Sequence, residues 1–488
     1  MSMDARGYWL ARFAFQRALA LVCLIAFIVA LNQFRALCGE RGLVSIQSFV
    51  KQVPYSQSPS LFYLAPRDGF FLITAWLGIV LSAFALLGFS ERYGAWLSML
   101  VWALIWILYL SFVNAGQIFY AFGWESILLE ACFLAIFLGS SGTMPQRIPL
   151  WLVRWLLFRV MLGAGLIKLR GDPCWRQLTC LDWHYETQPM PNPVSWFLHR
   201  APELTHKGGV LFNHFAELIV PFGYFLPQPI ATIAGVITII FQTCIMVSGN
   251  LSWLNLLTIV LAFPTIDDRV WTFLLRLHAP AIASPGKLEI YAQIGIGIVT
   301  VALSIPVIVN MFSPRQMMNY NYNPFHLVGT YGAFGSVTRP RFEVVVEGTE
   351  NATALATTGW QEYEFKGKPN DLRRMPPQIA PYHLRLDWLM WFAAMSSYDN
   401  HPWFVVFLQR LLEADHATLG LLRSDPFQGR RPRFVRALLY EYKFTSPEEH
   451  ARTGAWWIRQ PRGTYFPAVS LQSEQLKSLL RVLPGVTY

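Results

Sequence analysis

Long apolar runs separated by short polar segments fill the first two thirds of the chain. Each run has roughly 14 to 22 residues, close to the length of about 20 with which an α-helix crosses a bilayer. There are about nine such runs, and the fourth and eighth are short enough for tilted or re-entrant helices. The pattern therefore predicts a polytopic, all-α membrane region with about nine transmembrane helices. The runs cover residues 17–34, 69–89, 94–113, 124–138, 150–169, 209–226, 229–247, 251–263 and 290–311.

A different pattern marks the final third of the chain. The stretch 342–347, FEVVVE, is β-branched, and the stretch 360–365, WQEYEF, alternates, so both predict strands. The stretch 382–395, YHLRLDWLMWFAAM, predicts a helix after Pro381, because proline suits a first helical turn. A further helix is predicted over 401–414, HPWFVVFLQRLLEA. This part of the chain therefore reads as a small mixed α/β domain.

These patterns predict two domains. Residues 1–318 form the transmembrane domain, with an extracytoplasmic loop at 170–208, and residues 319–488 form the C-terminal extracytoplasmic domain. The arginines of MSMDARGYWLARFAFQR favour a cytoplasmic start and a retained signal-anchor helix. An odd number of spans then places the loop and the C-terminal domain outside.

Composition supports the membrane assignment and argues against nucleic acid. Hydrophobic residues make up 54% of the 488 residues and charged residues 14%, whereas soluble chains carry about 25% charged residues. The formal charge of +10 is not gathered in a lysine-rich or arginine-rich tract. We attribute it to cytoplasmic loops and lipid head groups, so the expected partner is the bilayer and not a nucleic acid.

Two of the six cysteines, Cys174 and Cys180, share one polar loop. Cysteines close together in an outward-facing loop usually pair, because that compartment is oxidising. The surrounding spacing lacks the second CxxC or the HxxxH of a zinc site. A disulfide is favoured; free thiols and a metal site stay as alternatives.

Polar residues inside the predicted spans are the sharpest signal, because an unpaired charge in lipid costs several kcal/mol. One interpretation pairs the arginines with the glutamates as structural links between helices, and the other makes them a polar cavity for a substrate or a proton path. His214 and Glu217 are three apart, which places them on one helical face. Lys168 closes its span and either snorkels to the interface or acts as a base. The cluster comprises Glu130, Arg154, Arg159, Asn213, His214 and Glu217, with Glu125 beside it.

The loop and the C-terminal helix hold further candidates. Asp172, Asp182, His184 and Glu186 suggest a metal, but their spacing fits no standard site, and a structural loop is favoured. The loop's aromatic residues Trp175, Trp183 and Tyr185 suit an interfacial belt. His383 and Asp387 are four apart and should meet on a helix, either as an ordering hydrogen bond or in catalysis. No metal or other cofactor is expected, and GxSxG, P-loop, GxGxxG and HExxH motifs are absent.

Five stretches carry a resemblance to a known family. They are GDPCWRQLTCLDWHYETQPMPNPVSWFLHRAPE (171–203), FNHFAELIVPF (212–222), SGNLSWLNLLTIVL (248–261), PPQIAPYHLRLDWLMWFAAM (376–395) and RALLYEYKFT (436–445). In these stretches the sequence resembles the lipase maturation factor family. The signature positions are Asp172, Trp175, Asp182, His184, Tyr185, Glu186 and Gln188 in the loop, and Pro381, Tyr382, His383, Arg385, Asp387 and Trp388 in the C-terminal motif.

The resemblance implies a membrane protein that helps secreted dimeric lipases, such as lipoprotein lipase, to reach an active fold. It implies a lumenal C-terminal domain, 319–488 here, that contacts the client. The membrane would be that of the endoplasmic reticulum in a eukaryote and the cytoplasmic (inner) membrane in a bacterium. A shorter stretch, AGLIKLRGDPCW (164–175), is similar to the vitamin K-dependent carboxylase, and that likeness implies Lys168 as a base.

Three functions follow as hypotheses. The first is a chaperone-like maturation factor without chemistry of its own, which holds a secreted lipase or another exported client. The second is an intramembrane enzyme acting on a lipid-soluble substrate, with Lys168 as base and Arg159, His214 and Glu217 shaping its cavity. The third is a transporter.

Overall fold

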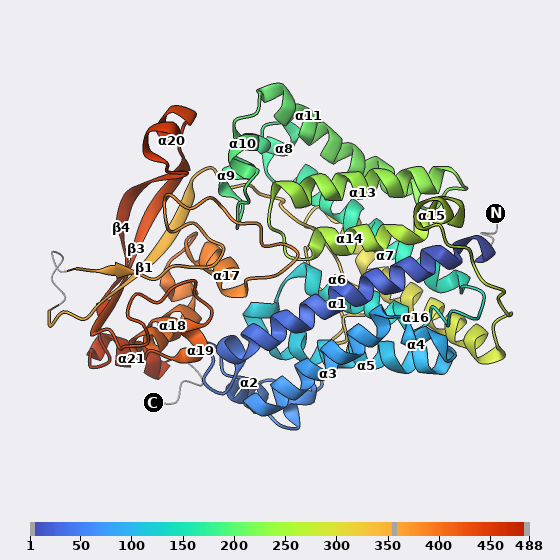
Figure 1. Ribbon diagram of the computed structural model, residues 1–488, viewed down its shortest axis with the longest axis horizontal. Helices are drawn as coiled ribbons and strands as arrows, with labels where there is room; N and C mark the ends of the chain where they lie inside the picture. The colour runs from blue at the N-terminus through green and yellow to red at the C-terminus, as the bar shows by residue number, and fades with distance from the viewer. Residues whose placement is uncertain (1–4, 354–358, 483–488) are drawn as a thin grey trace.

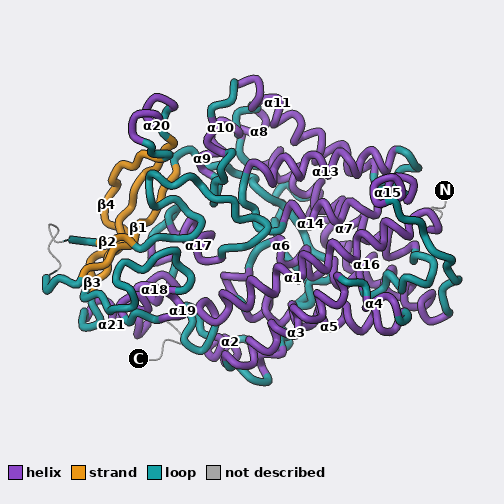
Figure 2. The backbone as a smooth tube through the Cα atoms, in the orientation of Figure 1, coloured by secondary structure: helices purple, strands orange, loops and turns teal. Residues whose placement is uncertain are grey.

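A computed structural model of the chain describes residues 5–353 and 359–482. Long helices lie side by side through most of the molecule, and the C-terminal third forms a sheet with short helices at one end (Figure 1). Figure 2 shows the strands gathered at that end and helices elsewhere. The N-terminus lies at the opposite end of the helical body from the sheet (Figure 1).

Among the described residues, six helices are long and apolar enough to cross a membrane. Each of them coincides with one of the predicted apolar runs. The structure therefore supports a mostly helical protein with six candidate spans, fewer than the nine predicted. The six are α1 (Trp9–Cys38), α3 (Asp68–Leu86), α5 (Ala95–Ala115), α7 (Arg147–Arg170), α13 (Ile230–Ser248) and α16 (Lys287–Phe312).

The other three predicted runs form shorter or interrupted helices. The short fourth and eighth runs become α6 (Gly123–Ala135) and α14 (Leu254–Ala262). The sixth run lies on α11 (Glu203–His214), a π-helical turn η4 (Phe215–Ile219) and α12 (Val220–Gly223). Pro221 lies in the first turn of α12, where its missing backbone donor is tolerated.

Short helices and turns connect these segments and complete the C-terminal part. The helices are α2 (Ile46–Gln52), α4 (Phe89–Arg92), α8 (Pro173–Arg176), α9 (Leu181–Thr187), α10 (Ser195–His199), α15 (Asp268–Leu275), α17 (Arg385–Ala393), α18 (Pro402–Leu412), α19 (His416–Leu419), α20 (Pro447–Thr453) and α21 (Glu474–Val482). The 3₁₀ turns are η1 (Ala5–Tyr8), η2 (Leu61–Tyr63), η3 (Gln117–Tyr120), η5 (Phe263–Thr265) and η6 (Tyr398–Asn400).

Four antiparallel strands form one sheet in the order β2-β1-β3-β4. The strand predicted at 342–347 is confirmed as β1 (Arg341–Thr349). The stretch predicted at 360–365 is a strand only at β2 (Gln361–Glu362). The sequence pattern did not predict β3 (Phe434–Phe444) or β4 (Trp457–Val469), which carry most of the ladder.

Both faces of β1 are covered, which explains its uninterrupted apolar run. Val344 and Val346 belong to the core that α17 and α18 share with the sheet. Val345 points to the other face and packs with Trp457 and with Trp196 of α10. The sheet therefore lies between its own helices and the loop that follows α7.

The two helices predicted in the C-terminal part have different outcomes. The one predicted over 401–414 is confirmed as α18. The one predicted from Pro381 onward is wrong at its start, because α17 begins only at Arg385. Residues before it are held in an extended path by the transmembrane helices: Gln33 of α1 donates to the carbonyl of His383 at 2.6 Å and accepts from the amide of Arg385 at 3.0 Å.

Helix α7 packs against α6, α14, α16 and η4, so it lies at the centre of the helical body. Gly163 allows the segment after α16 to approach α7, because a Cβ there would overlap the carbonyl oxygen of Tyr331. Gln316 fixes the same approach by donating to the carbonyl of Gly163 at 3.1 Å.

We predict that Gly163→Ala destabilises the protein by about 1–3 kcal/mol, because the added methyl group displaces a packed backbone. Gly295→Ala in α16 is the matched control, since none of the described residues outside its own stretch of helix backbone has a heavy atom within 4 Å of its Cβ position. Thermal unfolding in detergent measures both variants. Equal melting temperatures for the two would contradict the close approach at Gly163.

Candidate functional site

The loop after α7 is closed by a disulfide between Cys174 and Cys180. Both residues are fully buried, in a small cluster with Trp175 and Val210 of α11. Within the described part of the chain, no three His, Cys, Asp or Glu side chains are grouped to hold a metal ion. In the structure the two cysteines are therefore bonded to each other.

Asp172 joins this loop to the C-terminal part. Its carboxylate caps α8 by accepting from the amide of Cys174 at 3.0 Å, and it pairs with both terminal nitrogens of Arg339 at 2.8 and 3.0 Å. The hydrogen bonds from Arg339 hold the pKa of Asp172 well below its ordinary value. Arg339 also lies 4.3 Å from the ring centre of Trp183. Asp172 therefore caps α8 and forms an ion pair that joins the loop to the segment before β1.

Arg341, the first residue of β1, holds the other end of the loop. Its fully buried guanidinium donates to the carbonyls of Glu186, Gln188 and Pro189 at 3.0, 2.5 and 3.1 Å. The Glu186 carboxylate accepts from the amide of Phe444 at 2.8 Å, and burial raises its pKa. Both contacts cross between the loop and the sheet, and Glu186 is the signature residue whose side chain makes one of them.

Other signature residues tie the loop to neighbouring helices. The Gln188 side chain donates to Ser195 Oγ at 2.9 Å and to the carbonyl of Ser248, at the end of α13, at 3.0 Å. Asp182 bonds to His206 of α11 at 2.8 Å. Trp175 was expected in an interfacial belt, but it is buried, and its indole donates to the carbonyl of Phe334 at 2.8 Å. Residues after α16 cover it, which the local sequence did not indicate.

The two arginines of α7 are satisfied in different ways, one by a glutamate and the other by backbone carbonyls. Arg159 of α7 forms a buried ion pair with Glu130 of α6. Glu130 also accepts from the hydroxyl of Tyr331 at 2.8 Å. Among the described residues Arg154 has no acidic partner; it donates to the carbonyls of Pro264 and Tyr224 at 2.9 and 3.0 Å.

Lys168 forms the second buried pair, with Glu217. Its ammonium donates to Glu217 at 2.6 Å and to Asn213 at 2.8 Å, and Asn213 donates to Glu217 at 2.9 Å. Lys168 is only 4% exposed, so the expectation that it snorkels to the interface is wrong. Glu217 therefore pairs with a lysine and not with an arginine, because the π-helical turn places it beside the end of α7. His214, just before that turn, bonds instead to the carbonyl of Trp175 at 3.0 Å.

The C-terminal motif is buried against the transmembrane helices. Arg385 pairs with Glu125 of α6 at 2.8 Å and donates to the carbonyl of Phe119 at 2.7 Å. His383 lies 3.8 Å from the same carboxylate, among the rings of Trp124 and Trp388. The hydroxyl of Tyr382 accepts from Gln33 of α1 at 3.3 Å, and Pro381 begins this segment.

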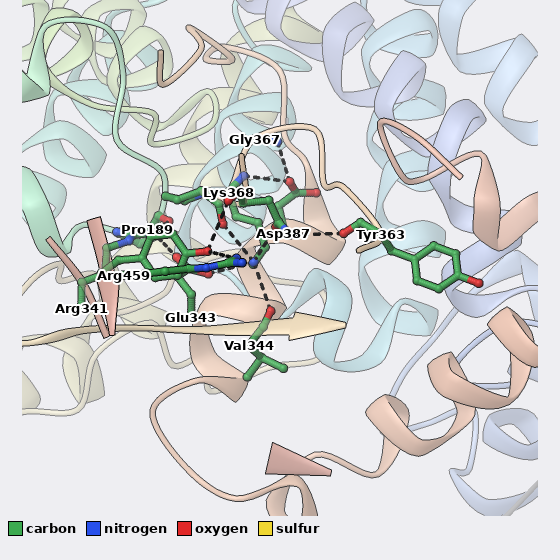
Figure 3. Close-up of polar contacts among 12 residues, drawn as sticks. Pro189, Arg341, Glu343, Val344, Tyr363, Gly367, Lys368, Asp387 and Arg459 are labelled. Atoms are coloured by element: carbon green, nitrogen blue, oxygen red, sulfur yellow. Dashed lines mark hydrogen bonds and ion pairs between the residues drawn. The ribbon is translucent and has the colours of Figure 1, made fainter. Parts of the chain in front are cut away.

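The expected contact between His383 and Asp387 is wrong, because His383 precedes the helix and faces α6. Asp387 instead accepts from the amides of Gly367 and Lys368 at 2.6 and 3.1 Å, and burial raises its pKa. Lys368 extends to Glu343 at 3.0 Å, and Glu343 meets Arg341 at 2.5 Å (Figure 3). This chain of buried charges links the motif to the loop contacts of Arg341.

A large cavity lies where the spans, the loop and the C-terminal part meet. Its volume is about 1010 Å³. Helices α7, α13 and α14 line one part of it, and α6, α11 and the residues after α16 line others. The Lys168–Glu217 pair and Asn213 also belong to the lining. The loop contributes Trp175, His184 and Tyr185, and α17 contributes Trp388. Of the polar cluster that the sequence offered as a possible cavity lining, Asn213 and Glu217 line this cavity, whereas Glu130, Arg154, Arg159 and His214 are not among its lining residues.

Comparison with known proteins gives the same assignment for both parts. A family model described as the lipase maturation factor transmembrane domain matches residues 10–273, and one described as the lipase maturation factor C-terminal domain matches residues 327–467. The chain belongs to the lipase maturation factor family. It is an integral membrane protein by its spans and its relatives.

Its relatives align over almost the whole chain. Lipase maturation factor 1 of Bos taurus is 43% identical, over 96% of this chain and 91% of the relative. Lipase maturation factor 1 of Homo sapiens is also 43% identical, over 98% of this chain and 91% of the relative. Lipase maturation factor 2 of Xenopus laevis is 29% identical, over 96% of this chain and 84% of the relative. No solved structure matches the chain significantly.

Several residues that hold the two parts together were not identified from the sequence. Asn250 accepts from the amides of Ile379 and Ala380 at 2.7 and 2.9 Å, and Gln33 binds the segment before α17. Both are uncharged amides at or near helix ends, where they look like ordinary polar residues. Only the positions of such residues in the sequence could have pointed to them. Asn250 lies inside one of the family stretches, and Arg341 directly precedes the FEVVVE strand.

We predict that Arg385→Ala destabilises the protein by about 3–5 kcal/mol, because it leaves the buried carboxylate of Glu125 without its partner. Lys207→Ala is the control, since the Lys207–Glu203 pair is exposed to solvent and such pairs contribute little to stability. Thermal unfolding in detergent and limited proteolysis measure the effect. Faster release of the C-terminal part is expected only for Arg385→Ala; equal behaviour would argue against this docking contact.

Proposed function

We propose that this protein is a membrane-bound maturation factor for secreted lipases. The observation that carries the proposal is the 43% identity over nearly the whole chain to proteins named lipase maturation factor 1. The absence of nucleophile, phosphate-binding and zinc-protease motifs in the sequence is in keeping with a protein that assists folding. Neither the enzyme nor the transporter hypothesis has support among the relatives.

A nine-pass topology is part of the proposal. One set of connecting segments meets at the N-terminal end of α1. There Trp9 donates to the carbonyl of Ser141, and Gln228 donates to Tyr8 and to the carbonyl of Thr265. A second set meets at the opposite end, where Arg170 bonds to Gln316 and Asn192 bonds to the carbonyl of Val247. The six long helices, with α6, the α11–α12 segment and α14, then pass nine times between these ends.

This topology supports the proposed orientation and domains. The disulfide loop and the C-terminal domain, 319–488, share one end of the helical body, and the N-terminus lies at the other (Figure 1). Disulfides persist in oxidising compartments, so this end faces the endoplasmic reticulum lumen in a eukaryote or the periplasm in a bacterium. Residues 1–318 are then the membrane domain. A secreted client would meet the loop and the C-terminal domain there.

The placement of the family motifs bears on how a client binds. Arg385, His383 and Trp388 are buried in the contact between the two parts, and Arg341 is buried in the loop contact. Side chains so enclosed are not available to a client. We therefore infer that the motifs hold the C-terminal domain in position and that the client contacts the solvent-facing side of this domain.

A functional test uses cells that lack their own lipase maturation factor. We predict that Cys174→Ser with Cys180→Ser lowers secreted lipase activity at unchanged level of the factor, because the loop that holds the C-terminal domain loses its closure. Cys244→Ser is the control, since this cysteine is free and exposed. Full activity of the double variant would remove the loop from the mechanism, and no activity of the wild-type chain would overturn the proposed function.

A topology test uses the sequence Asn351-Ala352-Thr353, whose asparagine is exposed. In microsomes, we predict that Asn351 is glycosylated and that Asn351→Gln removes the modification, because the C-terminal domain faces the lumen. An acceptor inserted after Pro280, at the opposite end, should stay unmodified. Glycosylation at the inserted site and none at Asn351 would reverse the orientation and contradict a role with secreted clients.

A further inference from the structure

The cavity beneath the disulfide loop has the size and lining of a lipid site. Its volume of about 1010 Å³ is at the upper end of small-molecule pockets, which span about 300–1,000 Å³. Membrane helices supply part of its apolar lining, with Val160 and Met161 of α7, Phe241 of α13 and Leu254 of α14. An apolar ligand would gain about 25 cal/mol for each Å² of surface removed from water.

The charges on this wall cancel. The ammonium of Lys168 already holds the carboxylate of Glu217 at 2.6 Å, and Asn213 bonds to both. A ligand with a carboxylate or a phosphate would have to displace Glu217, and leaving that carboxylate buried and unpaired is strongly unfavourable. The cavity is therefore matched to a ligand without net charge.

The remaining polar groups of the lining are neutral. Burial lowers the pKa of His184 to about 4, so its imidazole is uncharged near pH 7, and burial raises the pKa of Tyr185. The indole nitrogen of Trp388 and the amide oxygen of Asn255 are buried without a hydrogen-bond partner. The indole N–H can donate to a hydroxyl, ester or carbonyl oxygen of a ligand, and the amide oxygen can accept from a ligand hydroxyl.

One side of the cavity reaches exposed residues. Thr243, Cys244 and Val247 of α13 are exposed and belong to the lining. Because α13 is one of the candidate spans, its exposed side chains face the acyl chains of the bilayer in the proposed topology. A molecule dissolved in the membrane would enter beside α13, whereas a folded secreted client would not reach this depth.

We propose that this cavity binds an uncharged lipid, with its apolar chain along α7, α13 and α14 and its hydroxyl, ester or carbonyl end near Lys168 and His184. This site goes beyond the proposed function, because no client lipase is needed to form it. Acylglycerols and sterols both have this chemistry, and the competition arms below distinguish them.

The experiment uses the full chain in mild detergent and a monoacylglycerol that carries a diazirine in its chain. We expect saturable labelling of α13 and α14, competed by unlabelled monoolein if the site takes acylglycerols or by cholesterol if it takes sterols. A fatty acid and a lysophosphatidic acid of the same chain length should compete at least 10-fold more weakly. Labelling that is not saturable, or equal competition by the charged lipids, overturns the proposal.

Matched variants keep the test independent of folding. Cys244→Trp fills the cavity and should lower labelling at least 10-fold, whereas Val236→Trp, exposed on the same helix but outside the lining, should leave it unchanged. Both variants are first checked for wild-type melting temperatures. Equal labelling of the two variants overturns the proposal.

Two readouts test the site without photolabelling. Monoolein or cholesterol should slow alkylation of Cys244 by N-ethylmaleimide, because the thiol lies in the lining. Glu217→Gln leaves Lys168 without its counter-charge, so this variant should gain affinity for the fatty acid by at least 10-fold, and Lys168→Met with Glu217→Gln should lose that gain. Unchanged alkylation, or protection by a client-derived apolar peptide and not by either lipid, overturns the proposal.

Discussion

The buried ion pair between Arg385 and Glu125 is the contact on which the arrangement of this protein depends. It joins a residue of the C-terminal motif to a membrane helix, and both side chains are fully buried. A buried charge without a partner is strongly unfavourable, so each of the two residues requires the other part of the molecule in place. Gln33 and Asn250 extend the same contact with backbone hydrogen bonds to residues before α17. The C-terminal domain is thereby held as a fixed part of the membrane protein.

The loop after α7 makes the second connection. Its disulfide and its cap at Asp172 shape one end, and Arg341 collects three backbone carbonyls at the other. Because Arg341 also reaches Glu343 and, through it, Lys368 and Asp387, the loop and the motif are ordered by one network of buried charges. Such networks are stable only when each member is satisfied, so the loop, the first strand and the start of α17 must be in place together.

The same loop lines one side of the large cavity. The contact between the membrane helices and the C-terminal part therefore also determines the shape of the cavity. The wall is contributed by membrane helices, by the loop and by α17. Among the described residues that line it, Lys168 and Glu217 are the charged ones, and their charges cancel. A site of this kind suits an uncharged amphiphile.

Hydrophobic periodicity alone located all six long helices, the strand at β1 and the helix α18, because each of these is determined by a local run of apolar side chains. The same runs showed that α6 and α14 are short. The late start of α17, the long strands β3 and β4, and the partners of Arg154, Glu217, His383 and Asp387 were decided by the tertiary structure. Those outcomes depend on backbone carbonyls, carboxylates and strand edges contributed by segments far away in the chain, and burial makes satisfying them obligatory. A local pattern shows which side chains must find a partner; only the folded molecule determines which partner is within reach.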